Sequence, residues 1–220
     1  MRQLLVLRPE PGASATVERA RALGLDAVAA PLFELEPVAW SVPDPAEFDG
    51  LLLTSANAVR LAGPGLDRLR AMPAHAVGKA TANAARAVGL TIATTGEGGI
   101  EDLLDRLAPG LKLLHLAGEH RRSPAAPRQA ITAITVYRSR AIERGIAAAP
   151  GTIALVHSPR AGERLAASVA GREAMTIAAI SPAAAAAVGG GWEAVAVADR
   201  PDDDALLALA ARLCNKPSPQ

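Results

Sequence analysis

The sequence predicts an α/β protein with two parallel-sheet lobes of Rossmann-like or flavodoxin-like type. Short apolar runs alternate with helix-forming segments along the chain, and each run is continuously apolar. Continuous hydrophobicity is typical of strands covered on both faces, as in parallel sheets flanked by helices. About ten strands would be unusual in one open sheet, so we expect two smaller sheets.

The strands are predicted from these apolar runs and from the turn residues that follow them. In chain order they are Gln3–Arg8, Ala27–Pro31, Leu51–Thr54, His75–Gly78, Thr91–Thr94, Leu111–Leu116, Ile131–Tyr137, Ile153–His157, Thr176–Ile180 and Ala194–Val197.

Two segments interrupt this rhythm and predict a two-stranded linker between the lobes. Residues 31–48 alternate in polarity and contain four prolines, which favours an extended connector. Residues 130–145 contain a strand with no tight turn into a helix. We therefore expect a discontinuous first domain, residues 1–35 and 139–220, and a second domain, residues 36–138.

Composition excludes several classes of partner. The chain has 23 basic and 22 acidic residues and five aromatic ones, two Phe, two Trp and one Tyr. Near-neutral charge and few aromatic residues argue against a nucleic-acid or membrane partner. No apolar segment approaches the roughly 20 residues that cross a bilayer. The single cysteine, Cys214, favours a reducing cytoplasm.

Small polar residues follow many of the predicted strands. The sequences are "TSAN" at Thr54, "VGKAT" at Val77, "TGEGG" at Thr95, "LAGEH" at Leu116, "HSPRA" at His157 and "ISPAA" at Ile180. Serine caps a helix and proline suits its first position. A helix N-terminus binds anions, and in a parallel sheet all such turns lie at the carboxyl edge. We expect the turns of two facing lobes to line a cleft for a ligand with several carboxylates, although each turn alone also fits a purely structural role.

Nucleotide and metal motifs are missing from the sequence. Gly78-Lys79 lacks the other residues of a phosphate-binding loop, and Glu101 stands where a dinucleotide fingerprint needs its third glycine. His75, His115, His120 and His157 lack metal-ligand spacing, so we expect neither a metal site nor a catalytic histidine. Tyr137 is the single tyrosine; it could donate a proton to a leaving oxygen, or it could pack the linker.

Taken together, the motifs resemble the uroporphyrinogen-III synthase family. They occur in the family's order over nearly the whole chain: "LLVLRPEPG" from Leu4, "LLLTSANAV" from Leu51, "AVGKATANAARAVGL" from Ala76, "LAGEHRR" from Leu116, "VYRSR" from Val136, "LVHSPRAGERL" from Leu155 and "IAAISPAAAAAV" from Ile177.

The resemblance implies the reaction of that family. Its members expel the hydroxyl group of hydroxymethylbilane, a linear tetrapyrrole with eight carboxylates, invert the last ring through a spiro intermediate and close the macrocycle without a cofactor. Tyr137 matches the family's tyrosine and Thr81 its threonine, which could equally bond its own backbone. The other candidate binding residues are Thr54, Ser55, Asn57, Gly78, Gly118, Arg121, Ser158, Arg160 and Ser181.

The chain departs from the family at Ala183 and Ala184, where relatives commonly carry hydroxyl residues. Arg160 could compensate with its charge, or it could be a solvated helix arginine. We also expect a monomer in the cytoplasm, because nothing in the sequence demands more than one copy, and the resemblance suggests that it receives hydroxymethylbilane from hydroxymethylbilane synthase. A non-catalytic two-lobe module for a small ligand is the alternative, and a nucleotide-sugar transferase fits less well because its lobes are usually larger.

Overall fold

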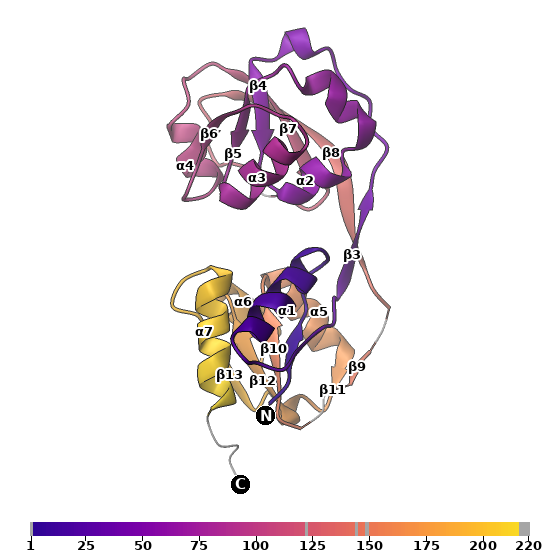
Figure 1. Ribbon diagram of the computed structural model, residues 1–220, viewed down its shortest axis with the longest axis vertical. Coiled ribbons are helices and arrows are strands. Elements are labelled where there is room, and N and C mark those ends of the chain that lie inside the picture. The colour runs from indigo at the N-terminus through magenta and orange to yellow at the C-terminus, as the bar shows by residue number, and fades with distance from the viewer. Residues whose placement is uncertain (1, 122, 144, 148–149, 216–220) are drawn as a thin grey trace. The chain divides into compact units, whose positions relative to one another are not determined.

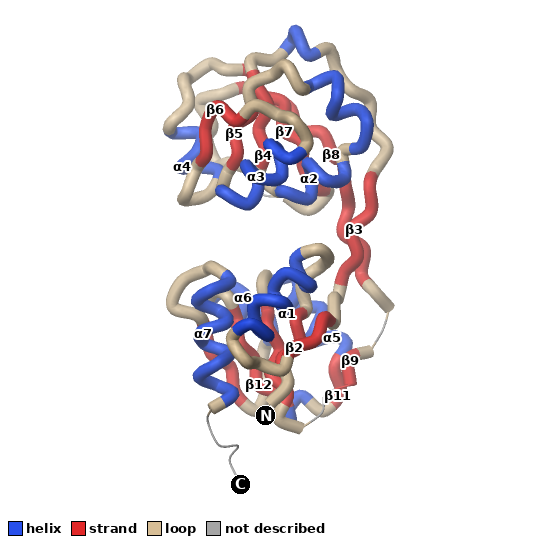
Figure 2. Tube along the Cα trace, in the orientation of Figure 1, coloured by secondary structure: helices blue, strands red, loops and turns tan. Residues whose placement is uncertain are grey.

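The computed structural model describes residues 2–121, 123–143, 145–147 and 150–215. Contacts within the chain divide it into two units (Figure 1). Unit 1 comprises Met1–Glu34 and Arg140–Gln220, and unit 2 comprises Leu35–Ser139. Both units contain a sheet with helices on its faces (Figure 2), so the predicted α/β class is confirmed.

The sheet of unit 1 has five parallel strands in the order β13-β12-β10-β1-β2. The strands are β1 (Leu4–Val6), β2 (Ala27–Ala29), β10 (Thr152–Val156), β12 (Met175–Ala179) and β13 (Ala194–Val197). The helices are α1 (Gly12–Ala22), α5 (Pro159–Ser168), α6 (Pro182–Val188), α7 (Asp203–Cys214) and a 3-10 turn, Arg172–Ala174. The short strands β9 (Ile146–Ala147) and β11 (Val169–Ala170) pair separately.

Alternate residues of these strands enter two cores, one on each face of the sheet. Leu4 and Val6 pack with residues of α1 and α7, whereas Leu5 and Leu7 pack with residues of α5 and α6. Each of these four leucine and valine side chains is buried. This burial on both faces explains the uninterrupted apolar runs in the sequence.

Unit 2 has a sheet of six strands in the order β3-β8-β7-β4-β5-β6. The strands are β3 (Phe33–Pro37), β4 (Gly50–Leu53), β5 (Ala74–Ala76), β6 (Ile92–Thr95), β7 (Lys112–Gly118) and β8 (Ala130–Ala141). The helices are α2 (Ala56–Leu61), α3 (Lys79–Ala87), α4 (Ile100–Asp105) and the 3-10 segments Pro45–Glu47 and Gly63–Leu69. Strands β4 to β8 pair in parallel.

Strands β3 and β8 carry the chain between the units and confirm the predicted two-stranded linker. The Val38 amide donates to the Val136 carbonyl at 2.9 Å, and the Ile142 amide donates to the Leu32 carbonyl at 3.0 Å. Residue numbers rise along one strand and fall along the other, so these two strands are antiparallel.

All ten predicted strands are present, with ends shifted by a few residues. The largest difference is β8, which runs to Ala141 rather than to Tyr137, because the connecting residues continue the sheet. The extended segment predicted at residues 31–48 contains β3. The sequence analysis did not predict β9 and β11, which are two residues each.

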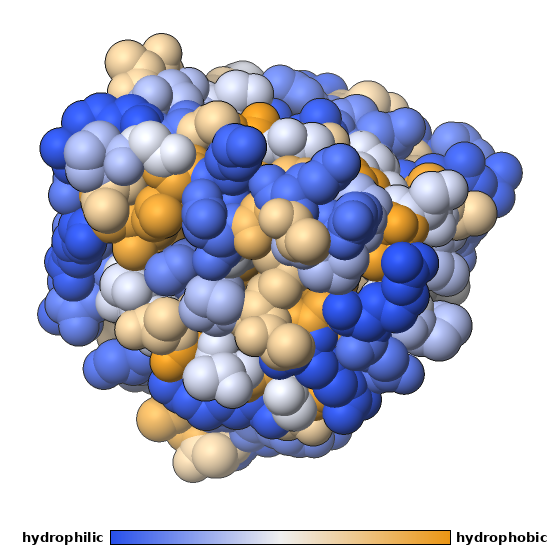
Figure 3. Space-filling view, turned by 90° about the horizontal axis from the view of Figure 1, so that it is seen from above, coloured by the Kyte–Doolittle hydropathy of each residue, from blue (hydrophilic) through white to orange (hydrophobic). Residues whose placement is uncertain are grey.

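The described residues include no helix with the length and apolarity of a membrane span. On the face shown in Figure 3, hydrophilic residues separate the described hydrophobic residues into small groups.

Candidate functional site

The carboxyl edge of the unit 2 sheet contains a topological switch point. From β4 the chain proceeds to β5 and β6 on one side, and it then returns to β7 and β8 on the other side. The switch point therefore lies between β4 and β7, which pair in parallel. In open α/β sheets this place is where ligands bind, because the connections diverge there and leave a crevice.

A pocket of about 300 Å³ lies at this switch point. Thr54 and Ser55 follow β4, Gly118 ends β7, and Tyr137 belongs to β8. The complete lining is Thr54, Ser55, Val77, Ile100, Gly118, His120, Arg121 and Tyr137. Five predicted site residues thus meet in one pocket: Thr54, Ser55, Gly118, Arg121 and Tyr137.

A β-bulge brings Tyr137 to Gly118. Ala117 pairs with Thr135, but the next residue, Gly118, pairs with Tyr137, so Val136 is the extra residue in β8. A bulge of one residue changes the face on which the following side chains lie. Val136 is fully buried, whereas Tyr137 is partly exposed in the pocket.

The Tyr137 hydroxyl is hydrogen-bonded to the turn after β4. It donates to Ser55 Oγ at 3.3 Å, and Ser55 Oγ also accepts the Asn57 amide at 3.1 Å, which caps α2. A serine oxygen has two acceptor sites and one proton. Because both acceptor sites are used, the Ser55 proton remains for a further acceptor, such as a ligand carboxylate.

Beneath the pocket, Thr54 Oγ1 lies 2.9 Å from Nε2 of His115 on β7. His115 is 2% exposed. Burial, and to a lesser degree the charge of Arg121, lowers the pKa of His115 to about 4. The ring is therefore neutral at pH 7 and positions the threonine hydroxyl without adding a charge.

Arg121 supplies positive charge at the rim of the pocket. Its Nη1 donates to the Gly118 carbonyl at 3.3 Å and to Thr135 Oγ1 at 3.2 Å. These contacts hold an exposed guanidinium beside the switch point, and its remaining N–H groups suit a carboxylate.

Three predicted residues of unit 2 lie outside the pocket lining. The Asn57 amide is bonded to Ser55, and its side chain accepts from Arg60 Nη1 at 3.1 Å. Gly78 caps α3 in an extended conformation, and Thr81 is 7% exposed on that helix. The Glu119 amide also lies in one of the predicted anion-binding turns, but it donates to the Tyr137 carbonyl at 2.9 Å. The amides of Asn57 and Glu119 are thus engaged within the protein.

The predicted residues of unit 1 lie at the carboxyl edge of its own sheet. Ser158 caps α5 by accepting the Ala161 amide, and Ser181 caps α6 by accepting the Ala184 amide, each at 3.2 Å. The guanidinium of Arg160 stacks over Phe33, with its carbon 4.2 Å from the ring centre.

The two alanines that depart from the family pattern differ in environment. Ala184 is fully buried, and its carbonyl lies where α6 crosses Gly162 of α5; a Cβ on Gly162 would stand 3.0 Å from that oxygen. Ala183 is exposed. A hydroxyl at position 184 would therefore enter the core of unit 1.

Four residues at this site were missing from the predicted set: Val77, Ile100, His120 and His115. Val77 and His120 belong to the turn sequences "VGKAT" and "LAGEH", and these sequences could have identified both residues. Ile100 begins α4, and His115 lies inside an apolar strand, so neither had a recognisable motif. Among the described residues, no group of three His, Cys, Asp or Glu side chains is placed to hold a metal ion.

Comparison with known proteins identifies the family. Residues 14–208 match the model of the family described as uroporphyrinogen-III synthase HemD. The chain belongs to the uroporphyrinogen-III synthase family. A uroporphyrinogen-III synthase from Chlorobaculum parvum is 37% identical over 90 residues, a match that spans 37% of this chain and 37% of that relative.

Solved structures of uroporphyrinogen-III synthases have the same fold. The enzyme from Helicobacter pylori aligns with a TM-score of 0.69 at 20% identity, over 97% of this chain and 100% of that one. A mutant enzyme from Thermus thermophilus aligns with a TM-score of 0.55 at 18% identity, over 98% of this chain and 100% of that one.

Proposed function

We propose that the chain is a uroporphyrinogen-III synthase, a cyclising lyase that converts hydroxymethylbilane to uroporphyrinogen III with inversion of ring D and loss of water. Membership of the family supports this activity. The observation that carries the proposal is the position of Tyr137, whose hydroxyl lies beside Ser55 in a polar pocket at a topological switch point.

The first step breaks the bond between the terminal carbon and its hydroxyl oxygen. In the proposal the Tyr137 phenol donates a proton to that oxygen, which leaves as water while the pyrrole nitrogen supplies the electron pair. The resulting azafulvene, still protonated on nitrogen, is attacked by the substituted carbon of ring D, which forms the spiro intermediate. Rearrangement and loss of a ring proton complete the macrocycle, and a proton returns to the phenolate.

The azafulvene also closes without inversion when no protein is present, so the protein must favour one geometry of the chain. The proton of Ser55, the guanidinium of Arg121 and the Thr54 hydroxyl held by His115 are suited to bind carboxylates near Tyr137. Each charge-assisted hydrogen bond contributes about 1.5 to 3 kcal/mol, so a few such bonds suffice to select one geometry.

Both units contribute in this proposal. The predicted domains, residues 1–35 with 139–220 and residues 36–138, each bind carboxylates of the same substrate at their own sheet edge. Gly78 and Thr81 in one domain, and Ser158, Arg160 and Ser181 in the other, remain proposed binding residues.

We further propose that the protein acts as a cytoplasmic monomer without a cofactor and receives hydroxymethylbilane from hydroxymethylbilane synthase. The single cysteine supports a reducing compartment. Transfer between the two enzymes would limit spontaneous closure of the bilane before it reaches Tyr137.

The test generates hydroxymethylbilane in situ, adds the protein, oxidises the product and separates the isomers. The proposal predicts mainly isomer III. Isomer I alone, as in the reaction without protein, would exclude the synthase and leave the non-catalytic binding module.

A further inference from the structure

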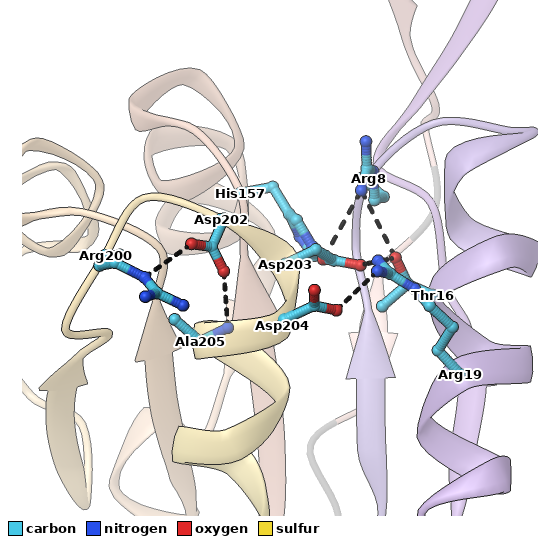
Figure 4. A network of polar contacts seen from close by, with 9 residues as sticks. All are labelled: Arg8, Thr16, Arg19, His157, Arg200, Asp202, Asp203, Asp204 and Ala205. Atoms are coloured by element: carbon cyan, nitrogen blue, oxygen red, sulfur yellow. Dashed lines mark hydrogen bonds and ion pairs between the residues drawn. The ribbon is translucent and has the colours of Figure 1, made fainter. Parts of the chain in front are cut away.

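Unit 1 has a topological switch point of its own, between β1 and β10. From β1 the chain proceeds to β2 on one side, and it later continues from β10 to β12 and β13 on the other side. Arg8 follows the carboxyl end of β1, and His157 follows that of β10. Figure 4 shows both side chains in one polar network at this edge. The sequence analysis assigned no role to Arg8.

The centre of the network is Asp203, the first residue of α7, whose side chain is 12% exposed. Its carboxylate accepts the Thr16 hydroxyl at 2.8 Å and faces His157 Nε2 at 2.7 Å. Arg19 forms a close ion pair with the same carboxylate. Three strong partners therefore already satisfy this buried charge.

His157 contributes a neutral ring to the network. Burial is the main cause that lowers its pKa to about 3, and the charges of Arg8 and Arg19 act in the same direction. Its Nε2 faces the Asp203 carboxylate at 2.7 Å, and its Nδ1 lies 3.3 Å from the Leu155 carbonyl. His157 stabilises Asp203 without competing for an added anion.

Arg8 makes only long contacts with Asp203 and Thr16, and the Asp203 carboxylate already has three strong partners. Its Nη1 lies 3.6 Å from Asp203 Oδ1 and 3.4 Å from Thr16 Oγ1. A guanidinium has five N–H donors, and in Figure 4 the other end of the Arg8 group points away from Asp203. The side chain is 37% exposed, so its remaining donors are accessible.

The backbone fixes the position of this side chain. A Cβ on Gly12, which begins α1, would stand 2.6 Å from Arg8 Nε and 3.0 Å from Arg8 Cζ. The glycine therefore leaves the space in which the guanidinium lies. Burial, followed by the charge of Arg19, lowers the pKa of Arg8 below its ordinary value. Burial and the charge of Arg19 both disfavour the positively charged form of Arg8. A bound anion would offset this effect.

From this arrangement we infer that Arg8 binds a carboxylate of the ligand at the switch point of unit 1, and that Thr16, Arg19, His157 and Asp203 position it. The inference rests on the proposed function for the chemical class of the ligand, a polycarboxylated tetrapyrrole. A carboxylate matches the guanidinium in a planar, bidentate geometry that lysine cannot provide.

The experiment measures the dissociation constant of uroporphyrin III, a stable octacarboxylate, for the full chain and its Arg8→Gln and Arg8→Lys variants. Arg212→Gln is the matched control, because it removes the same charge from α7 at an exposed pair with Asp199. Loss of a charge-assisted hydrogen bond weakens binding roughly 10- to 100-fold. We expect that loss for Arg8→Gln, a smaller one for Arg8→Lys and no change for Arg212→Gln.

Thermal unfolding of each variant separates binding from folding. A lower melting temperature for Arg8→Gln with unchanged affinity would overturn the inference and leave Arg8 as an ion-pair partner of Asp203. Equal weakening by Arg212→Gln, or no binding of uroporphyrin III by the unchanged chain, would also overturn it. Failure of the proposed function would give a different result. Isomer III would then be absent, while the affinity for uroporphyrin III would still depend on Arg8.

Discussion

The Tyr137 ring lies against the backbone of Gly118: a Cβ on Gly118 would stand 2.7 Å from Tyr137 Cζ and 2.8 Å from its hydroxyl oxygen. Real Cβ atoms do not approach other atoms so closely. Gly118 is therefore present because it leaves space for the phenol, in addition to any contact of its backbone with a ligand. The bulge at Val136 and this glycine together fix the position of Tyr137.

Gly118→Ala should lower turnover roughly 10- to 100-fold, because the added methyl group displaces the tyrosine hydroxyl by a fraction of an ångström or more. Turnover is measured as isomer III formed per protein. Gly190→Ala is the control, since no atom lies within 4 Å of a Cβ at that position. Unchanged turnover in Gly118→Ala would show that the position of the ring does not matter.

Tyr137→Phe should lower turnover by about 100-fold or more if the phenol is the general acid. The free energy of unfolding should change by less than about 1 kcal/mol, because the hydroxyl makes one long, partly exposed bond to Ser55, 3.3 Å in length. Stability is followed by urea denaturation. A variant that keeps full turnover would make Tyr137 a linker residue only.

Ser158→Ala should lower the free energy of unfolding by about 1 kcal/mol, because the Ala161 amide loses its cap at the start of α5. Ser158→Gly should lower it by only a few tenths of that amount, since glycine is tolerated at this position. Both variants are compared with the unchanged chain by urea denaturation. Equal stability of the alanine variant and the unchanged chain would contradict the capping role.

The free energy of unfolding should depend on pH through His115. Its pKa is about 4 in the folded chain and about 6.5 in the unfolded chain. The unfolded state therefore binds more protons between these values, and stability is complete above pH 6.5 and falls as pH decreases toward 4. Between pH 6.5 and 5.5 this histidine should account for about 1 kcal/mol of the loss.

Between pH 6.5 and 5.5, the loss in free energy of unfolding of His115→Asn should be smaller than that of the unchanged chain by about 1 kcal/mol. Urea denaturation measures this difference. His120→Asn, which replaces a side chain that is 58% exposed, is the surface control. A pH dependence of His115→Asn identical to that of the unchanged chain would contradict the assigned shift.

The sequence was sufficient to predict the parallel sheets and the residues that end their strands. Continuous apolar runs such as Leu51 to Leu53 have side chains buried on both faces of the sheet, and the turn residues Thr54 and Ser55 follow directly. These are local properties of the chain. The apolar runs and the turn residues can therefore be recognised from the sequence alone.

The parts that depend on strand order could not be predicted in the same way. Pairing of β4 with β7, and of β1 with β10, creates the two switch points, and it joins residues more than 60 positions apart. The bulge at Val136 depends on register, which no local pattern specified. His115 and Arg8 acquire their roles only through these contacts, so sequence motifs do not identify either residue.

The most direct test of the central claim is isomer analysis under multiple turnover, with hydroxymethylbilane in large molar excess over the protein. A catalyst that holds the bilane beside Tyr137 gives many equivalents of isomer III for each equivalent of protein, and Tyr137→Phe shifts the product toward isomer I. Formation of no more than one equivalent of isomer III for each equivalent of protein, or of isomer I alone, would contradict the account.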